Sequence, residues 1–192
     1  MMKSAPLTIA IDANEANISQ RVGSNVYAHS LLTALEKISR ARSPQLQFRL
    51  LLKHPPQPDL PPTRDGWHYQ QLTPSPLWTQ WALPRYLFAH RQELAFFFSP
   101  GHYAPAHCPL PFAVTIMDLA YLNHPHYFTW RDRTKLRLLT EASLKQATHL
   151  FAISQATRRQ LRHHYHLPAS KISLAYPALN PSPTVTPTEA KE

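Results

Sequence analysis

The chain has 192 residues, 43% of them hydrophobic, which is enough to bury one sizeable core and too little for two domains of ordinary size. Its formal net charge of +9 favours anionic partners (phosphates, nucleic acid or an acidic membrane face), although a solvated basic surface would give the same count. One cysteine, Cys108, excludes an internal disulfide framework, and no apolar run approaches the roughly 20 residues that span a bilayer, so we expect a cytoplasmic protein, peripheral to a membrane at most.

The first half of the chain shows three strand-like runs and one clear helix. Short apolar runs predict strands over residues 7–11 and 47–52, and a weaker one over 67–72. Between the first two, apolar residues recur with helical spacing, and Ser24 or Asn25 is a candidate N-cap, with Pro44 closing the segment. The stripe consists of Tyr27, Leu31, Ala34, Leu35 and Ile38.

The second half alternates strands and helices. A helix interrupted near Pro84 is predicted within residues 77–90. Continuous apolar runs predict buried strands over 94–98 and 112–117, and a further strand over 149–153. Helical spacing covers residues 130–147, with Leu136, Leu139, Ser143, Leu144 and Ala147 on one face, and Ser154 caps a basic helix that ends near Tyr165. The last predicted strand is 172–176.

Strands that alternate with helices indicate an α/β fold with a doubly wound, mainly parallel, Rossmann-like sheet. We assign residues 1–176 to this domain and residues 177–192 to a Pro-rich flexible tail. Ligands of such sheets bind beyond the carboxyl ends of the strands. The loops after Ile11, Phe98, Met117 and Ile153 are therefore the places to look for a site.

Two carboxylates stand where a buried strand runs into a loop. Asp12 and Asp118 could each orient a hydroxyl-rich substrate or transfer a proton, or could cap the following loop by accepting backbone N–H bonds. For Asp12 the capping role is favoured, and for Asp118 the two roles are balanced.

Arg21, Gly23, Ser24 and Asn25 lead into the first predicted helix. Exposed N–H groups at a helix start can receive a phosphate, and Arg21 would add charge. With only three glycines, the chain has neither a dinucleotide fingerprint nor a P-loop, so no cofactor of those kinds is expected. The histidines of residues 163–166 lack nearby Cys, Asp or Glu, which disfavours a metal site.

Basic residues are densest in two predicted helices, at Arg131, Arg133, Lys135 and Arg137 and at Arg158, Arg159 and Arg162. They could follow a nucleic-acid backbone, but no nucleic-acid-binding motif accompanies them, so we regard nucleic acid as an unfavoured partner. Anionic lipid or a pyrophosphate-linked acceptor fits the same charges.

Taken together, four segments resemble the N-terminal domain of the retaining glycosyltransferases of family 4, which have a GT-B architecture of two facing Rossmann-like domains. The segments are the strand and glycine loop of residues 9–27, the Phe-Ser-Pro-Gly stretch at 97–101, the Val-Thr-Ile-Met-Asp-Leu stretch at 114–119 with residues 120–128, and the strand, Ser cap and helix of 147–177. The resemblance covers about residues 7–180, so the chain is similar to one half of a GT-B enzyme.

The chain departs from the family pattern in two respects. Met117 stands where the family usually has a histidine that contacts the transferred sugar, and a thioether cannot replace its hydrogen bonds. In the family a second domain holds the nucleotide-sugar donor, in part through two glutamates that lie eight positions apart. No two glutamates of this sequence have that spacing. We therefore expect the donor to need a domain that this chain lacks, and the chain alone to be an incomplete hexosyltransferase.

The resemblance implies transfer of a sugar to a glycan or a lipid-linked acceptor. It places Asp118 at the catalytic position and Arg21, Gly23, Ser24, Asn25 and Tyr121 at the acceptor, with a separate C-terminal transferase half as a candidate partner. The alternative is a non-catalytic, free-standing α/β domain that binds a glycan, an anionic lipid or a partner transferase subunit.

Overall fold

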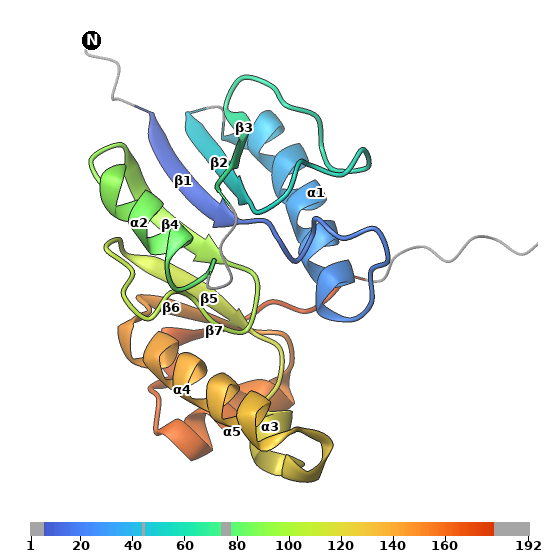
Figure 1. Cartoon of the computed structure of the whole chain (residues 1–192), viewed down its shortest axis with the longest axis vertical. Helices are drawn as coiled ribbons and strands as arrows, with labels where there is room; N and C mark the ends of the chain where they lie inside the picture. The colour runs from blue at the N-terminus through green and yellow to red at the C-terminus, as the bar shows by residue number, and fades with distance from the viewer. Residues whose placement is uncertain (1–5, 44, 74–77, 179–192) are drawn as a thin grey trace, which may run out of the picture.

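The computed structural model describes residues 6–43, 45–73 and 78–178. A sheet of seven strands, all parallel, runs through the molecule in the order β3-β2-β1-β4-β5-β6-β7 (Figure 1). The strands are β1 (Leu7–Asp12), β2 (Leu46–Leu52), β3 (Trp67–Gln71), β4 (Leu94–Ser99), β5 (Phe112–Ile116), β6 (His149–Ala152) and β7 (Ile172–Leu174). The predicted Rossmann-like α/β fold is confirmed, because strand order reverses direction between β1 and β4.

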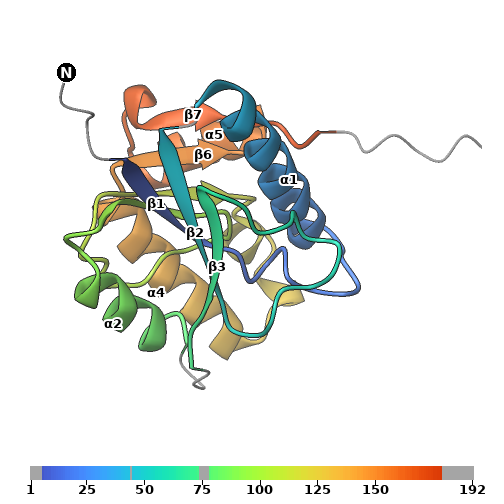
Figure 2. The same cartoon turned by 90° about the horizontal axis from the view of Figure 1, so that it is seen from above.

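Helices cover the two faces of the sheet unequally. The helix α1 (Ser24–Arg42) lies on one face, and α2 (Ala82–Ala89) and α4 (Trp130–Gln146) lie on the other, as the view from above shows (Figure 2). The remaining helical segments are α3 (Ala120–Asn123), the short turn η1 (Pro125–Tyr127), α5 (Gln155–Tyr165) and η2 (Ala169–Lys171). Right-handed crossovers dictate this division, since the chain moves outward from β1 in one direction and then from β4 in the other.

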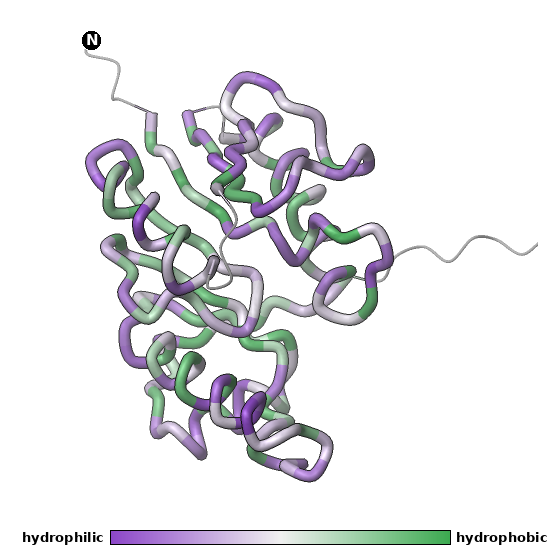
Figure 3. The backbone as a smooth tube through the Cα atoms, in the orientation of Figure 1, coloured by the Kyte–Doolittle hydropathy of each residue, from purple (hydrophilic) through white to green (hydrophobic). Residues whose placement is uncertain are grey.

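Each face has its own hydrophobic core. Ala28 and Leu32 of α1 pack with Ile11, Leu50 and Trp67 on one face. On the other face, the core joins α2, α4 and α5 to the strands through Leu83, Leu87, Leu144, Leu161, Phe97 and Val114. All five residues of β5 are buried, as expected for a central strand covered on both sides. Hydrophobic segments, among them β4 and β5, lie in the middle of the molecule, and hydrophilic segments are frequent in the outer loops (Figure 3).

The predicted stripe of α1 only partly coincides with its buried side. Tyr27 is buried and Leu35 packs against the core, as predicted, whereas Ile38 is exposed, and Ala28 and Leu32, outside the stripe, are buried. Tyr27, Leu31 and Leu35 also line an apolar hollow of about 470 Å³ beside the sheet, together with Phe98 and Phe151. Helical spacing found the apolar side of α1, but it did not distinguish the part that reaches the core from the part beside this hollow.

Two local predictions were wrong. The N-cap of α1 is Gly23, with φ of 52°, and neither Ser24 nor Asn25 caps the helix with its side chain. Pro84 does not interrupt α2, because it is the third residue of a helix that starts at Ala82, where a missing N–H costs no helical bond. Ser154 does cap α5 as predicted, since its Oγ accepts a hydrogen bond of 3.0 Å from the Thr157 N–H.

The predicted boundary between domain and tail falls at the end of the described chain. After β7, the Ala175 N–H still donates to the Ala152 carbonyl of β6 at 2.9 Å, and residues 176–178 continue past the start of α1. The rest of the predicted tail, residues 179–192, lies outside the described residues, as does Pro44. Over the described ranges, no helix combines the length and the apolar character that crossing a bilayer requires.

Candidate functional site

A cavity of about 600 Å³ lies between the start of α1 and the segments that follow β4, β5, β6 and β7. These four strands are neighbours in the sheet, α1 follows β1 in the chain, and strand order reverses between β1 and β4. In doubly wound sheets the loops separate at such a reversal and leave room for a ligand. The cavity wall includes Gly23, Ser24, His102, Met117 and Asp118.

The N-terminus of α1 forms one wall of this cavity. Gly23 adopts a positive φ of 52°, which L side chains rarely adopt, and its hydrogens face open space, since a Cβ at this position would have no atom within 4 Å. The helix is 19 residues long and has no side-chain cap, and its first residues line the cavity, so the positive end of its dipole lies at the cavity wall. This wall suits an oxygen-rich or anionic group.

Glu15 fixes the loop before α1. Its carboxylate accepts hydrogen bonds from the Asn25 Nδ2 at 2.6 Å and from the Ser24 Oγ at 3.3 Å. Its Cγ also packs close to Gly101, in the loop after β4. The predicted residues Ser24 and Asn25 are thus tied to one carboxylate, and only Ser24 lines the cavity.

His102 lines this cavity and also a second, adjoining cavity of about 370 Å³. Burial lowers the pKa of its imidazole, against the opposing influence of the Asp118 and Glu15 carboxylates. At neutral pH the ring is therefore neutral, with one nitrogen able to donate and the other to accept a hydrogen bond. Sequence reasoning named the loop after β4 but did not select this histidine.

Asp118 stands beside His102 on the cavity wall. One carboxylate oxygen, Oδ1, accepts a hydrogen bond of 2.8 Å from the Ala120 N–H, so the residue does cap the loop that leads into α3. The side chain is exposed and lines the cavity, which leaves the second oxygen available to a ligand. The structural and the functional role are compatible in this residue.

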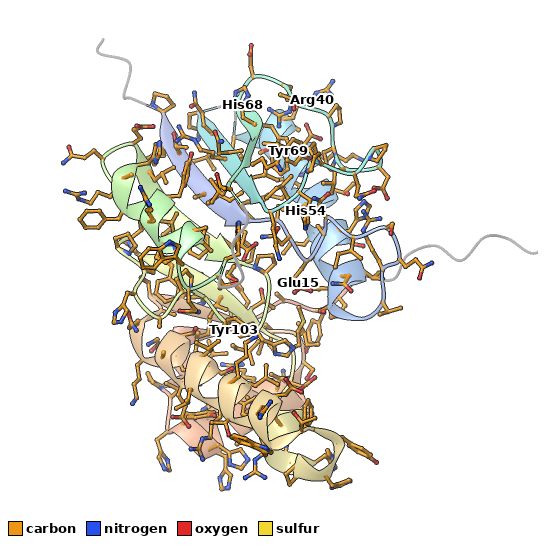
Figure 4. All side chains as sticks on the ribbon, in the orientation of Figure 1. Glu15, Arg40, His54, His68, Tyr69 and Tyr103 are labelled. Atoms are coloured by element: carbon orange, nitrogen blue, oxygen red, sulfur yellow. The ribbon has the colours of Figure 1, made fainter. Side chains whose placement is uncertain are left out.

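The second cavity is more polar and extends toward the loops after β1 and β2. Its lining includes Asp12, Glu15, His54 and Tyr103, and Figure 4 shows the last three side chains around the end of the sheet. Asp12 Oδ1 accepts hydrogen bonds from the Asn14 N–H at 3.1 Å and from Asn14 Nδ2 at 2.8 Å. Asp12 therefore caps the loop after β1, the role that the sequence favoured. Burial nevertheless raises the pKa of Asp12 to about 6.

The structure places two predicted acceptor residues elsewhere. Arg21 directs its guanidinium at Asp59, with Nη2 2.9 Å from Oδ1, and its Nε donates to the Ala16 carbonyl at 2.9 Å. A phosphate contact would require this pair to open. Tyr121 is only 2% exposed, and its hydroxyl lies 3.0 Å from that of Tyr165 in the core, so it presents no surface to the cavity.

Two site residues, Glu15 and His102, escaped the sequence analysis. Both lie in loops that follow strands, and the only signal was that position, because each lacks a local motif. Among the residues that the structure describes, no group of three or more His, Cys, Asp or Glu is arranged to hold an ion.

Solved glycosyltransferase-fold structures resemble this chain at low sequence identity. HepE of Anabaena in complex with UDP-glucose superposes with a TM-score of 0.56 at 14% identity, over 91% of this chain and 44% of HepE. Sucrose-phosphate synthase of Thermosynechococcus elongatus superposes with a TM-score of 0.58 at 15% identity, over 88% of this chain and 48% of the synthase. The chain therefore spans less than half the length of either structure, and the likeness shows that it has the Rossmann-like fold of one half of a GT-B structure.

Sequence comparison with curated proteins gave no match. The profile of Glycosyltransferase Family 4, in contrast, matches residues 23–182, which is most of the described domain. That range includes α1, the loop of His102 and the strand that leads to Asp118. The chain thus belongs to glycosyltransferase family 4.

Proposed function

We propose that this domain binds the acceptor in a sugar transfer from a nucleotide-sugar to a glycan or a lipid-linked sugar. The observation that carries the proposal is the cavity beyond β4 and β5, where the start of α1, His102 and Asp118 line one space. A sugar acceptor offers hydroxyl groups, and this wall offers a neutral imidazole, a carboxylate oxygen and the positive end of a helix dipole to bind them.

Asp118 and His102 have complementary tasks in this proposal. The Asp118 carboxylate accepts a hydrogen bond from an acceptor hydroxyl and orients it, while its other oxygen stays on the Ala120 N–H. The neutral His102 ring accepts or donates a second hydrogen bond, which Met117 on the same wall cannot do with its thioether. An imidazole is thus present in the cavity although the chain has methionine at position 117.

The donor side of the reaction requires a second domain in this proposal. Related folds are about twice as long as this chain, and HepE is a structure with UDP-glucose bound. We therefore expect no turnover of a nucleotide-sugar by the 192-residue chain alone. Turnover assays of the chain, alone and mixed with separately expressed C-terminal halves of family members, test this expectation. Turnover by the chain alone would contradict the proposal that a second domain is required.

Acceptor binding can be tested without turnover. We expect hexose 1-phosphates and disaccharides to shift the amide NMR signals of Gly23, Ser24, His102 and Asp118 in the isolated chain. His102→Ala and Asp118→Asn should each weaken this binding by roughly tenfold, the worth of one or two hydrogen bonds to a ligand. Asp118→Asn retains an oxygen for the Ala120 N–H, so the loop should keep its cap.

His68→Ala is the matched control. His68 is an exposed histidine of β3 that lies far from Glu15 and Tyr103 (Figure 4). The proposal fails if the shifts gather away from the cavity, or if His68→Ala weakens binding as much as His102→Ala.

The second candidate function is a non-catalytic domain that binds a glycan, an anionic lipid or a partner transferase. Met117 favours it, because this side chain lines the cavity at the position where the family has a sugar-binding histidine. Sugar binding without any activity in mixtures with C-terminal halves would support this alternative.

A further inference from the structure

The helices α2 and α4 form an outer layer that exposes aromatic side chains. Large hydrophobic side chains usually lie inside, yet Trp130 is 72% exposed and Trp81 is 64% exposed. Phe88 on α2, Tyr127 just before α4 and Leu138 on α4 are also exposed. Both helices lie on the same side of the sheet, opposite α1 (Figure 2).

The same layer is strongly basic. Residues 78–93 and 124–146 contain seven Lys and Arg against three Asp and Glu. The three carboxylates are already engaged, since Glu93 pairs with Arg49, Glu141 with Arg137, and Asp132 accepts from Thr129. Among the described residues, the remaining cations of the layer have no carboxylate within 4.0 Å; they are Arg85, Arg91, Arg131, Arg133, Lys135 and Lys145.

Aromatic and basic groups are also in direct contact at two places in the layer. The Arg91 guanidinium lies 4.2 Å from the centre of the Phe88 ring, and the Arg131 guanidinium lies 5.5 Å from that of Trp130. An amphipathic ring with a cation over it matches the boundary between acyl chains and anionic headgroups, where Trp, Tyr and Arg are favoured.

We propose that the α2–α4 layer docks this domain on the surface of an anionic lipid bilayer. Trp130 and Tyr127 enter the headgroup region, and the cations of α4 that lack a carboxylate contact lipid phosphates. Because α4 returns the chain from the carboxyl end of β5 to the amino end of β6, its first residue, Trp130, lies at the edge of the sheet that bears the cavity. Docking there would bring the cavity close to lipid headgroups.

A bilayer fits this layer better than nucleic acid does. The aromatic residues stand on the outer surfaces of two helices and the turn before α4, with an aliphatic residue, Leu138, among them. Single strands are bound in a groove with stacking platforms, and duplexes by a segment inserted in a groove of the nucleic acid. An outer helix layer with exposed apolar and basic side chains instead matches a membrane interface.

Vesicle flotation tests the proposal with the full chain. Vesicles of phosphatidylcholine mixed with phosphatidylglycerol should bind the protein, and vesicles of phosphatidylcholine alone should not. The triple variant Arg131→Gln, Arg133→Gln, Lys135→Gln should lower the partition coefficient by about a hundredfold, since each cation near an anionic surface contributes roughly a factor of five. Trp130→Ala should lower it by roughly tenfold.

Matched controls lie on the opposite face. Arg40→Gln with Arg42→Gln removes exposed charges from the last turn of α1, and Val22→Ser removes an exposed apolar side chain. These variants should keep vesicle binding within about twofold. Brominated lipids should quench Trp130 fluorescence in a Trp81→Phe variant, because the remaining Trp67 and Trp78 are buried.

Three results would overturn the proposal: equal binding to neutral vesicles, equal losses in the α1 controls, or binding of RNA that quenches Trp130 without vesicle binding. Failure of sugar binding would leave the vesicle results unaffected, so the docking surface and the acceptor cavity are tested separately.

Discussion

Arginines have different partners at the α1 edge of the molecule and in the α2–α4 layer. At the α1 edge, Arg21 pairs with Asp59 and Arg64 with Glu36, so each joins the helix or its preceding loop to the long connection between β2 and β3. In the layer, Arg131 and Arg133 have no carboxylate within 4.0 Å among the described residues. Ion pairs cancel their own charge, so the unpaired cations of the layer contribute to the net charge of +9 and are available to a partner.

The largest expected difference between the two regions is in stability. Arg64 also donates to the Ser39 Oγ at 3.0 Å and to the Glu36 carbonyl at 3.2 Å, and Ser39 is buried. Arg64→Ala takes the arginine away from the partly buried Glu36 carboxylate and removes one bond to Ser39 Oγ, which still donates to the Glu36 carbonyl at 2.9 Å. We expect it to lower the free energy of unfolding by about 2–3 kcal/mol in urea titrations.

Arg133→Ala on α4 is the comparison for this variant. Removal of this exposed surface cation should change the free energy of unfolding by less than about 0.5 kcal/mol. Similar losses of unfolding free energy in Arg64→Ala and Arg133→Ala would mean that ion pairing does not distinguish the two regions.

Two carboxylates differ in the same way as these arginines. Asp59 forms an ion pair with Arg21, whereas Asp12 has no basic partner among the described residues. Burial raises the pKa of Asp12 from 3.8 to about 6, so the ionised form penalises the folded state at pH 7.5, and this penalty disappears as the pH falls from about 6 to below 4. Asp12→Asn keeps the oxygen that accepts from Asn14. We expect it to raise the free energy of unfolding by about 1–2 kcal/mol at pH 7.5.

Urea titrations at pH 7.5, 6 and 5 measure this effect. The gain should shrink steadily with pH, whereas Asp132→Asn, at an exposed carboxylate on α4, should show no such gain. A gain that does not depend on pH, or a loss at pH 7.5, would contradict the account of Asp12.

Local sequence patterns were sufficient for most of the fold. The apolar run at β5 predicted a buried central strand, and Ser154 predicted the start of α5, because both depend on adjacent residues. The cap of α1 was not predictable in the same way, since Gly23 holds a positive φ although Ser24 and Asn25 carry the side chains that usually cap a helix. Those two side chains bond to Glu15 instead.

The site depended on contacts between distant segments. His102 gains its importance from Asp118 and Glu15, which come from the ends of two other strands. Arg21 was expected to bind phosphate, but it meets Asp59, 38 positions later in the chain. Tyr121 was expected at the acceptor, but Tyr165 meets it in the core. The sequence therefore predicted which loops lie at the carboxyl ends of the strands. It did not predict which side chains of those loops form hydrogen bonds or ion pairs with distant residues.

The smallest expected effect concerns the exposed pair at the α1 edge. The hydrogen bonds from Arg21 lower the pKa of Asp59 to about 2 from the usual 3.8, so the pair stabilises the fold above about pH 4, and this contribution is lost as the pH falls toward 2. Because Asp59 is largely exposed, solvent screens the pair, and Arg21→Gln should cost less than about 1 kcal/mol at pH 7. The sharper measurement is an NMR titration of the Asp59 carboxyl carbon, whose pKa should return toward 3.8 in Arg21→Gln and stay near 2 in Arg133→Gln. An unchanged Asp59 pKa in Arg21→Gln would mean that Arg21 is free, and the guanidinium would then again be a candidate for the acceptor phosphate.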